Sequence, residues 1–191
     1  NTTSGLGMEV DDKSIYEVIM GRMKLTDVME ETEFKNLSIA GSDVRLANAE
    51  LELVEVEKRE YRLKTAVQSV QQDFDFIFID CPPSLGLLTI NALGAADSVL
   101  IPIQCEYYAL EGVASLMNTI SRVKKTINPH LEIEGVLLTM LDGRTNLGLQ
   151  VVDEVKKHFK KQVYATVIPR SVRLGEAPSH GEPIHVYDKR S

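Results

Sequence analysis

Short apolar segments alternate along the chain with longer segments of helical spacing. Most of the short segments are continuous apolar runs, which is typical of strands buried on both faces of a parallel sheet. The predicted strands are Leu37–Ala40, Phe76–Ile79, Ser98–Ile103, Gly135–Met140 and Val163–Ile168.

The segments between these strands carry apolar residues every three to four positions. This spacing predicts helices over Leu51–Val70, Leu110–Ile127 and Leu147–Phe159. Strands alternating with helices of this length indicate βαβ units, and therefore an α/β fold with a doubly wound, mostly parallel sheet. The sequence shows no repeat, low-complexity tract or linker, so residues 1–191 are expected to form one domain.

Composition narrows the classes of function. The 191 residues carry a net charge of -7, which argues against overall electrostatic attraction to nucleic acid. Any DNA contact therefore requires a local basic patch. The two cysteines form no metal or disulfide pattern and suit a reducing cytoplasm. No apolar run approaches the ~20 residues that span a bilayer, and no secretory leader is visible, so no membrane association is expected.

The sharpest local feature is the segment that runs from Phe74 to Gly86. An apolar strand is predicted to end on Asp80, and Pro82 and Pro83 then fix the direction of a turn. A carboxylate at a strand tip can hold a water molecule of an Mg²⁺ ion that bridges nucleotide phosphates. The alternative is that Asp80 only caps the turn that follows it.

Two further segments follow predicted strands but do not fit the alternation of strands and helices. They are Arg144–Gly148 and Pro169–Gly181. Ligands of open α/β sheets bind outside the carboxyl ends of the strands, so these segments and Asp80–Gly86 are the first places to look for chemistry.

Several runs of the sequence resemble the ParA/Soj family of chromosome- and plasmid-partitioning ATPases, which have a P-loop NTPase-like fold of the MinD/ParA superfamily (SIMIBI type). The likeness covers essentially the whole chain. It is carried by Asn1–Gly7, Asp80–Leu93, Val99–Glu111, Gly135–Leu149 and Ile168–Pro183.

The resemblance implies ATP and Mg²⁺ as cofactors and assigns residues to them. Asp80 matches the family's Walker B aspartate, which holds Mg²⁺ through water, and Pro82 lies in the same motif. Pro169 and Ser171 match positions beside the adenine and ribose, where the family often has Asn in place of Ser171. Arg170 lies next to them and could serve the nucleotide or DNA.

The resemblance also implies that Arg144 and Arg173 hold DNA without reading its sequence. Such contacts are pairings with phosphate, which depend on salt and not on base identity. The alternative is that these arginines are solvated or paired with a nearby acid, and Asp142 lies two residues before Arg144.

The phosphate-binding side of such a site is missing from this sequence. A phosphate-binding loop ends in Gly-Lys followed by Ser or Thr, and the chain contains no Gly-Lys pair. In the family this loop and the catalytic switch I aspartate precede the position of Asn1, and a closing helix follows Ser191. The chain is therefore expected to be a fragment, incomplete at both ends, inactive as given and without catalytic residues of its own. Its Phe76–Ile79 segment would then expose apolar faces.

The leading interpretation is a DNA-segregation ATPase of the bacterial nucleoid. It would dimerise on ATP, bind DNA non-specifically and be stimulated by a ParB-like partner. The alternative is a non-catalytic, truncated paralogue that acts as a binding or dimerisation module. A membrane-associated MinD-like ATPase would need a C-terminal basic amphipathic helix, and the given chain stops before one could appear.

Overall fold

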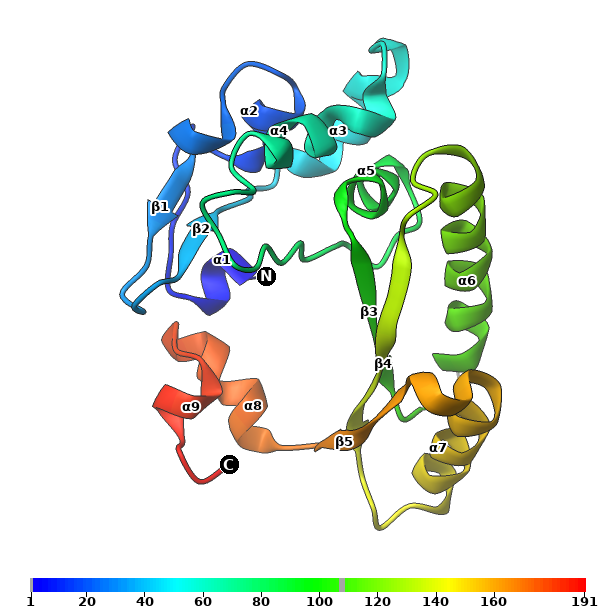
Figure 1. Cartoon of the computed structure of the whole chain (residues 1–191). Coiled ribbons are helices and arrows are strands. Elements are labelled where there is room, and N and C mark those ends of the chain that lie inside the picture. The colour runs from blue at the N-terminus through cyan, green and yellow to red at the C-terminus, as the bar shows by residue number, and fades with distance from the viewer. Residues whose placement is uncertain (1, 107–108) are drawn as a thin grey trace. The chain divides into compact units, whose positions relative to one another are not determined.

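The computed structural model describes residues 2–106 and 109–191 (Figure 1). By its internal contacts the chain divides into two compact units. One unit comprises the residues up to Ala95 together with Arg173–Ser191, and the other comprises Ala96–Val172. Tyr107 and Tyr108, which belong to one of the family-like runs, lie outside the described residues.

The second unit is a parallel three-stranded sheet in the order β3-β4-β5. Two helices and a short 3-10 turn connect its strands. The elements are β3 (Ser98–Gln104), α6 (Ala109–Thr126), β4 (Glu132–Leu141), α7 (Asn146–Phe159), η4 (Lys160–Gln162) and β5 (Val163–Pro169). The predicted α/β fold with a parallel sheet is confirmed, as are three of the predicted strands and two of the helices.

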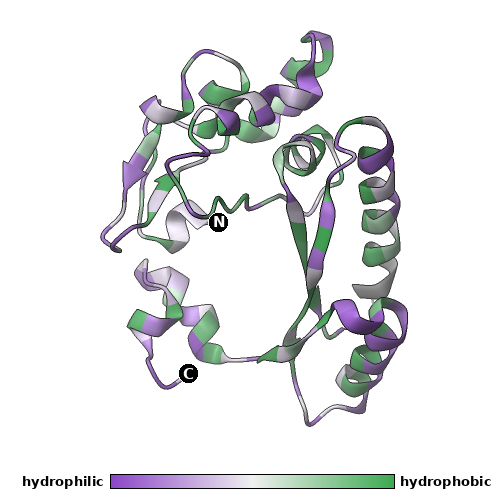
Figure 2. Cartoon of the chain, viewed as in Figure 1, coloured by the Kyte–Doolittle hydropathy of each residue, from purple (hydrophilic) through white to green (hydrophobic). Residues whose placement is uncertain are grey.

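The core of this unit lies on one side of the sheet, where both α6 and α7 pack (Figure 1). Apolar side chains of the strands and helices are buried there, among them Ile101, Ile103, Val136, Leu138, Ile120, Val123 and Val155. Figure 2 shows hydrophobic and hydrophilic residues alternating along α6, as expected for a helix with one face on a core. Leu100 and Pro102 of β3 are exposed, so burial on both faces is wrong for this strand.

The first unit is built from short elements. Its helices are α1 (Thr2–Gly5), α2 (Ile15–Ile19), α3 (Leu46–Glu52), α4 (Arg62–Gln68), α5 (Leu87–Ala95) and α9 (Ile184–Tyr187), and α8 (Val172–Glu176) begins at its boundary. Its 3-10 turns are η1 (Leu25–Asp27), η2 (Leu53–Glu55), η3 (Arg59–Tyr61) and η5 (Ala177–His180). Strands β1 (Met29–Glu31) and β2 (Ser38–Ala40) form an antiparallel hairpin.

Two small hydrophobic clusters hold these elements together. Tyr16 and Ile19 of α2 pack with Ala49 of α3 and with Leu53. Val18, Leu25, Val28 and Val70 form the other cluster. Tyr16 and Ile19, which are three residues apart on α2, therefore face one cluster, and Val18 between them faces the other. Contacts with both clusters fix this short helix between its neighbours.

Three predictions for this unit are wrong in detail. The strand at Leu37–Ala40 exists, but it pairs antiparallel with β1 and not within the parallel sheet. The helix over Leu51–Val70 is interrupted, because Lys58 adopts a left-handed backbone conformation with φ of 55° between η2 and η3. The Pro169–Gly181 segment is not a plain loop, since α8 and η5 lie within it.

Phe76–Ile79 does not form a strand. A strand needs ladder hydrogen bonds to a neighbour, and the sheets of the described residues contain no partner for this segment. Phe76 and Phe78 are 81% and 87% exposed, which agrees with the expected exposure of apolar faces here. Among the described residues, no helix is long and apolar enough to cross a membrane.

Candidate functional site

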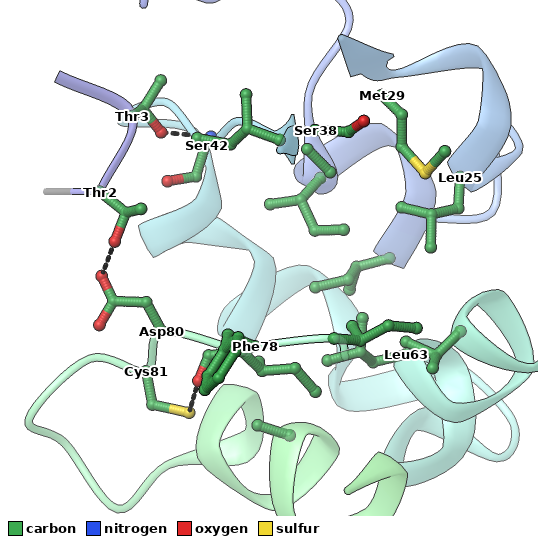
Figure 3. Close-up of a pocket in the computed structure, with 18 of the residues that line it drawn as sticks. Thr2, Thr3, Leu25, Met29, Ser38, Ser42, Leu63, Phe78, Asp80 and Cys81 are labelled. Atoms are coloured by element: carbon green, nitrogen blue, oxygen red, sulfur yellow. Dashed lines mark hydrogen bonds between the residues drawn. The ribbon is translucent and has the colours of Figure 1, made fainter. Parts of the chain in front are cut away.

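Asp80 lies in the first unit, near the end of an extended segment that leads into α5. Its carboxylate is exposed, and its Oδ2 accepts a hydrogen bond of 2.6 Å from the Thr2 hydroxyl at the start of α1 (Figure 3). The Thr2 hydroxyl thus connects two segments that are 78 residues apart.

A cavity of about 320 Å³ adjoins this carboxylate and is lined only by residues of the first unit. Most of its wall is apolar and includes the extended segment, in which the rings of Phe76 and Phe78 stack with centroids 6.4 Å apart. Figure 3 shows the polar side chains of Thr2, Thr3, Ser42 and Asp80 gathered at one end. The polar chemistry of this cavity is therefore concentrated around Asp80.

The loop after Asp80 is held by contacts that do not use its carboxylate. Glu50 of α3 accepts a hydrogen bond of 3.1 Å from the Leu88 amide in the first turn of α5. A Cβ atom at Gly86 would lie 2.2 Å from the same Glu50 oxygen, so a side chain here would displace the Glu50 carboxylate. Glu50 thus caps α5, whereas the Asp80 carboxylate accepts its hydrogen bond from Thr2. Pro82 is exposed within this loop.

Cys81 follows Asp80, and its thiol lies 3.6 Å from the Ile79 carbonyl oxygen, to which it donates. Burial raises the pKa of this thiol, and the negative charge of Asp80 raises it further. Both effects favour the protonated thiol, which is a weaker nucleophile than the thiolate.

In the second unit, the carboxyl ends of β4 and β5 meet. Leu141 is paired with Pro169, and the Arg170 amide donates a hydrogen bond of 3.0 Å to the Leu141 carbonyl oxygen. The Arg170 guanidinium forms an ion pair with Glu106, which follows β3. Pro169 and Arg170 therefore lie beside the loop that carries Arg144, at the carboxyl edge of the sheet, and the half-buried Ser171 follows them.

Arg144 forms a bidentate ion pair with Asp142 in this loop. Its Nε lies 2.9 Å from Oδ1 and its Nη2 2.7 Å from Oδ2, although the arginine side chain is 89% exposed. Hydrogen bonds from Arg144 are the main cause that lowers the pKa of Asp142 to about 2. The acid pairing considered as an alternative for Arg144 is thus present.

Arg173 lies in α8 and belongs to the first unit. Its Nη1 lies 2.9 Å from Glu176 Oε2, and its Nε lies 3.7 Å from Asp188 Oδ2. The hydrogen bond to Glu176 is the largest cause that raises the pKa of Arg173. The predicted site residues thus divide between the units: Asp80, Pro82 and Arg173 in the first, and Arg144, Pro169, Arg170 and Ser171 in the second.

Sequence reasoning did not identify Thr2, Glu50 or Glu106 as partners of the site. Glu106 follows a predicted strand, so the rule that places ligands at carboxyl ends could have marked it. The sequence near Thr2 and Glu50 carries no comparable signal, because each meets a residue more than 35 positions away. Among the described residues, no group of three or more His, Cys, Asp or Glu side chains could hold a metal ion by itself.

Comparison with known proteins assigns the chain to a family. Residues 1–133 match a family model described as an AAA domain. The chain is 58% identical over 193 aligned residues to the sporulation initiation inhibitor protein Soj of Bacillus subtilis, covering 100% of this chain and 76% of that protein. It is 50% identical to the chromosome partitioning protein ParA of Myxococcus xanthus, covering 100% of this chain and 68% of that protein.

Solved structures with the same fold include nucleotide complexes. Cobyrinic acid a,c-diamide synthase from Mycobacterium smegmatis, with a bound ATP analogue and magnesium, is 38% identical with a TM-score of 0.81, covering 88% of this chain and 68% of that one. A McdA–ATP complex from Cyanothece has a TM-score of 0.89 at 22% identity, covering 98% of this chain and 75% of that one, and shows likeness of fold alone.

Proposed function

Because the chain belongs to the ParA/Soj family of partitioning ATPases, we propose that it acts as the ATP-dependent switch of a DNA-segregation system. The observation that carries this proposal is the similarity over the whole chain to two proteins named for sporulation control and chromosome partitioning. The switch dimerises on ATP, binds DNA of the nucleoid non-specifically in the cytoplasm, and is stimulated by a ParB-like partner.

ATP and Mg²⁺ are the proposed ligands, and the residues present fit the metal. Asp80 offers an exposed carboxylate with the Thr2 hydroxyl beside it, and Mg²⁺ prefers such oxygen donors. Mg²⁺ is usually held by one or two carboxylates together with phosphate oxygens, so a larger acidic cluster is not required. When bound, the ion supplies positive charge against the phosphates. Asp80 would hold one of its water molecules.

The remaining nucleotide contacts are proposed for Pro82, Pro169, Arg170 and Ser171. Support comes from the paired ends of β4 and β5, which put Pro169 and Arg170 at the carboxyl edge of a parallel sheet. Arg170 carries a guanidinium that can bond to phosphate or ribose oxygens once it exchanges Glu106 for the ligand.

Arg144 and Arg173 are proposed to contact DNA phosphates. Both guanidiniums are exposed, and each is already held by a carboxylate of its own unit. Phosphate must therefore compete with Asp142 and Glu176. The net charge of -7 opposes DNA binding by a single copy, and a homodimer would double the number of arginines that face the duplex.

Charge reversal in the full-length protein tests the DNA contacts. Arg144→Glu and Arg173→Glu are expected to lower DNA retention at least ten-fold and to leave ATP binding unchanged, because phosphate contacts dominate non-specific affinity. The control is Arg122→Glu on the exposed side of α6, which should retain DNA normally. Loss of ATP binding together with DNA binding would contradict the separation of the two roles.

Neutralising the competing carboxylate provides the opposite test. Asp142→Asn removes the charge that pairs with Arg144, so DNA affinity is expected to rise and to remain dependent on salt. An unchanged or lower affinity would show that Asp142 does not compete with phosphate.

We further infer that a polypeptide limited to these 191 residues does not turn over ATP, because it contains no Gly-Lys pair of a phosphate-binding loop. This feature favours a second candidate function, a non-catalytic binding or dimerisation module. Equilibrium ATP binding with and without Mg²⁺, measured beside phosphate release, distinguishes the two. Sustained release by the 191-residue polypeptide would overturn the inference.

A further inference from the structure

The hydrogen bond between Thr2 and Asp80 is short and charge-assisted. The distance of 2.6 Å between Thr2 Oγ1 and Asp80 Oδ2 lies in the range of hydroxyl donors to ionised carboxylates. Asp80 is exposed and its backbone belongs to no helix or strand, so little else in its own segment restrains it. A bond to Oδ2 restricts the rotation of the carboxylate, and with it the directions that Oδ1 can take.

The position of Thr2 is itself set by contacts that do not involve Asp80. The neighbouring Thr3 hydroxyl accepts a hydrogen bond of 3.1 Å from the Ser42 amide (Figure 3). After α1, Gly7 crosses Gly181 so closely that a Cβ atom at Gly181 would lie 2.7 Å from the Gly7 Cα. Helix α1 is therefore anchored at two further points, and it presents the Thr2 hydroxyl as a preorganised donor.

We propose that Thr2 is a positioning residue that orients the Asp80 carboxylate towards the water shell of a nucleotide-bound Mg²⁺ ion. This inference rests on the proposed function, in which Asp80 serves the metal. Thr2 touches neither metal nor nucleotide in this role. It acts as the hydrogen-bonding partner that sets the geometry of a metal-binding carboxylate, and loss of such partners typically weakens metal affinity about 10- to 100-fold.

The test is equilibrium ATP binding by the full-length protein, measured with Mg²⁺ and with EDTA. Thr2→Val keeps the shape of the side chain and removes the donor. It is expected to reduce the Mg²⁺-dependent gain in affinity about ten-fold and to leave the affinity in EDTA unchanged. Thr2→Ser restores the hydroxyl and should retain the gain. The matched control is Thr3→Val, the same change one residue away in the same helix, where the lost bond goes to Ser42.

Each outcome decides the proposal. Loss of the gain in Thr2→Val alone, with thermal unfolding like that of the wild type, supports it. An unchanged gain in Thr2→Val overturns it, and so does an equal loss in Thr3→Val, because the effect would then come from the anchoring of α1. Failure of the proposed function gives a different result. In that case the wild type shows no Mg²⁺-dependent ATP binding, or the Asp80→Asn protein retains the Mg²⁺-dependent gain in affinity. Either result also rules out the role of Thr2.

Discussion

Arginine side chains at the proposed sites are held by nearby carboxylates. Arg144 pairs with Asp142, Arg170 with Glu106, and Arg173 with Glu176. Ion pairs this exposed contribute little to stability. Their larger effect is to hold each guanidinium in one orientation, and in the proposed contacts phosphate would have to displace a carboxylate. The pairs therefore bear more on ligand binding than on folding.

The pH dependence of the Arg144–Asp142 pair follows from the lowered pKa of Asp142. This pKa is about 2 in the folded protein against an ordinary 3.8, because Arg144 bonds to the ionised carboxylate. The stabilisation by the pair is thus present above pH 3.8 and is lost as the pH falls through about 2. Carboxyl-carbon NMR should show Asp142 titrating near pH 2 in the wild type and closer to 3.8 in Arg144→Ala. Arg122→Ala should leave this titration unchanged, and a wild-type midpoint near 3.8 would refute the pairing in solution.

The buried side chain of Asn91 forms hydrogen bonds to three short elements of the first unit. Its Nδ2 donates to the Arg59 carbonyl of η3 at 2.8 Å and to the Leu87 carbonyl of α5 at 3.0 Å. Its Oδ1 accepts from the Leu63 amide of α4 at 3.1 Å. The Asn91 side chain is fully buried, so water could not replace its hydrogen bonds to these three groups if the side chain were removed. Asn91 therefore ties the start of α5, which follows the Asp80 loop, to the rest of the unit.

Asn91→Ala is expected to lower the free energy of unfolding by about 2–4 kcal/mol, because it leaves the Leu63 amide and two carbonyl groups without their partner. Denaturant unfolding measures the change. Asn48→Ala, at an exposed position of α3, is the control and should stay within about 0.5 kcal/mol of the wild type. Equal effects of the two substitutions would show that the Asn91 hydrogen bonds contribute little.

At the scale of the whole molecule, segments far apart in the sequence meet within one unit. Gly7 and Gly181 both have φ of 67°, and their backbones cross in contact. This crossing joins the α1 segment to the segment after η5. A Cβ atom added to Gly5 of α1 would also lie 4.0 Å from the Pro178 side chain. The first unit is thus closed by contacts between its earliest and latest residues.

Gly181→Ala is expected to destabilise the protein by about 2 kcal/mol or more, because a side chain is strained at positive φ and its Cβ would overlap the Gly7 backbone. The control is Gly175→Ala in α8, where a Cβ meets nothing within 4 Å and alanine should favour the helix. Thermal unfolding compares the two. A Gly181→Ala protein as stable as Gly175→Ala would show that the crossing is loose in solution.

The hydrophobic pattern by itself determined the α/β class, three parallel strands and the helices α6 and α7, because periodicity along a segment is a local property. It also directed attention to Asp80 and to the loops after β4 and β5. Only the tertiary structure decided the partners: Thr2 for Asp80, Glu50 for the start of α5, and Glu106 for Arg170. It also decided that Phe76–Ile79 forms no strand, since an apolar run becomes a strand only where a neighbour completes its hydrogen bonds. These outcomes depend on which distant segments the fold brings together, and no local pattern encodes that.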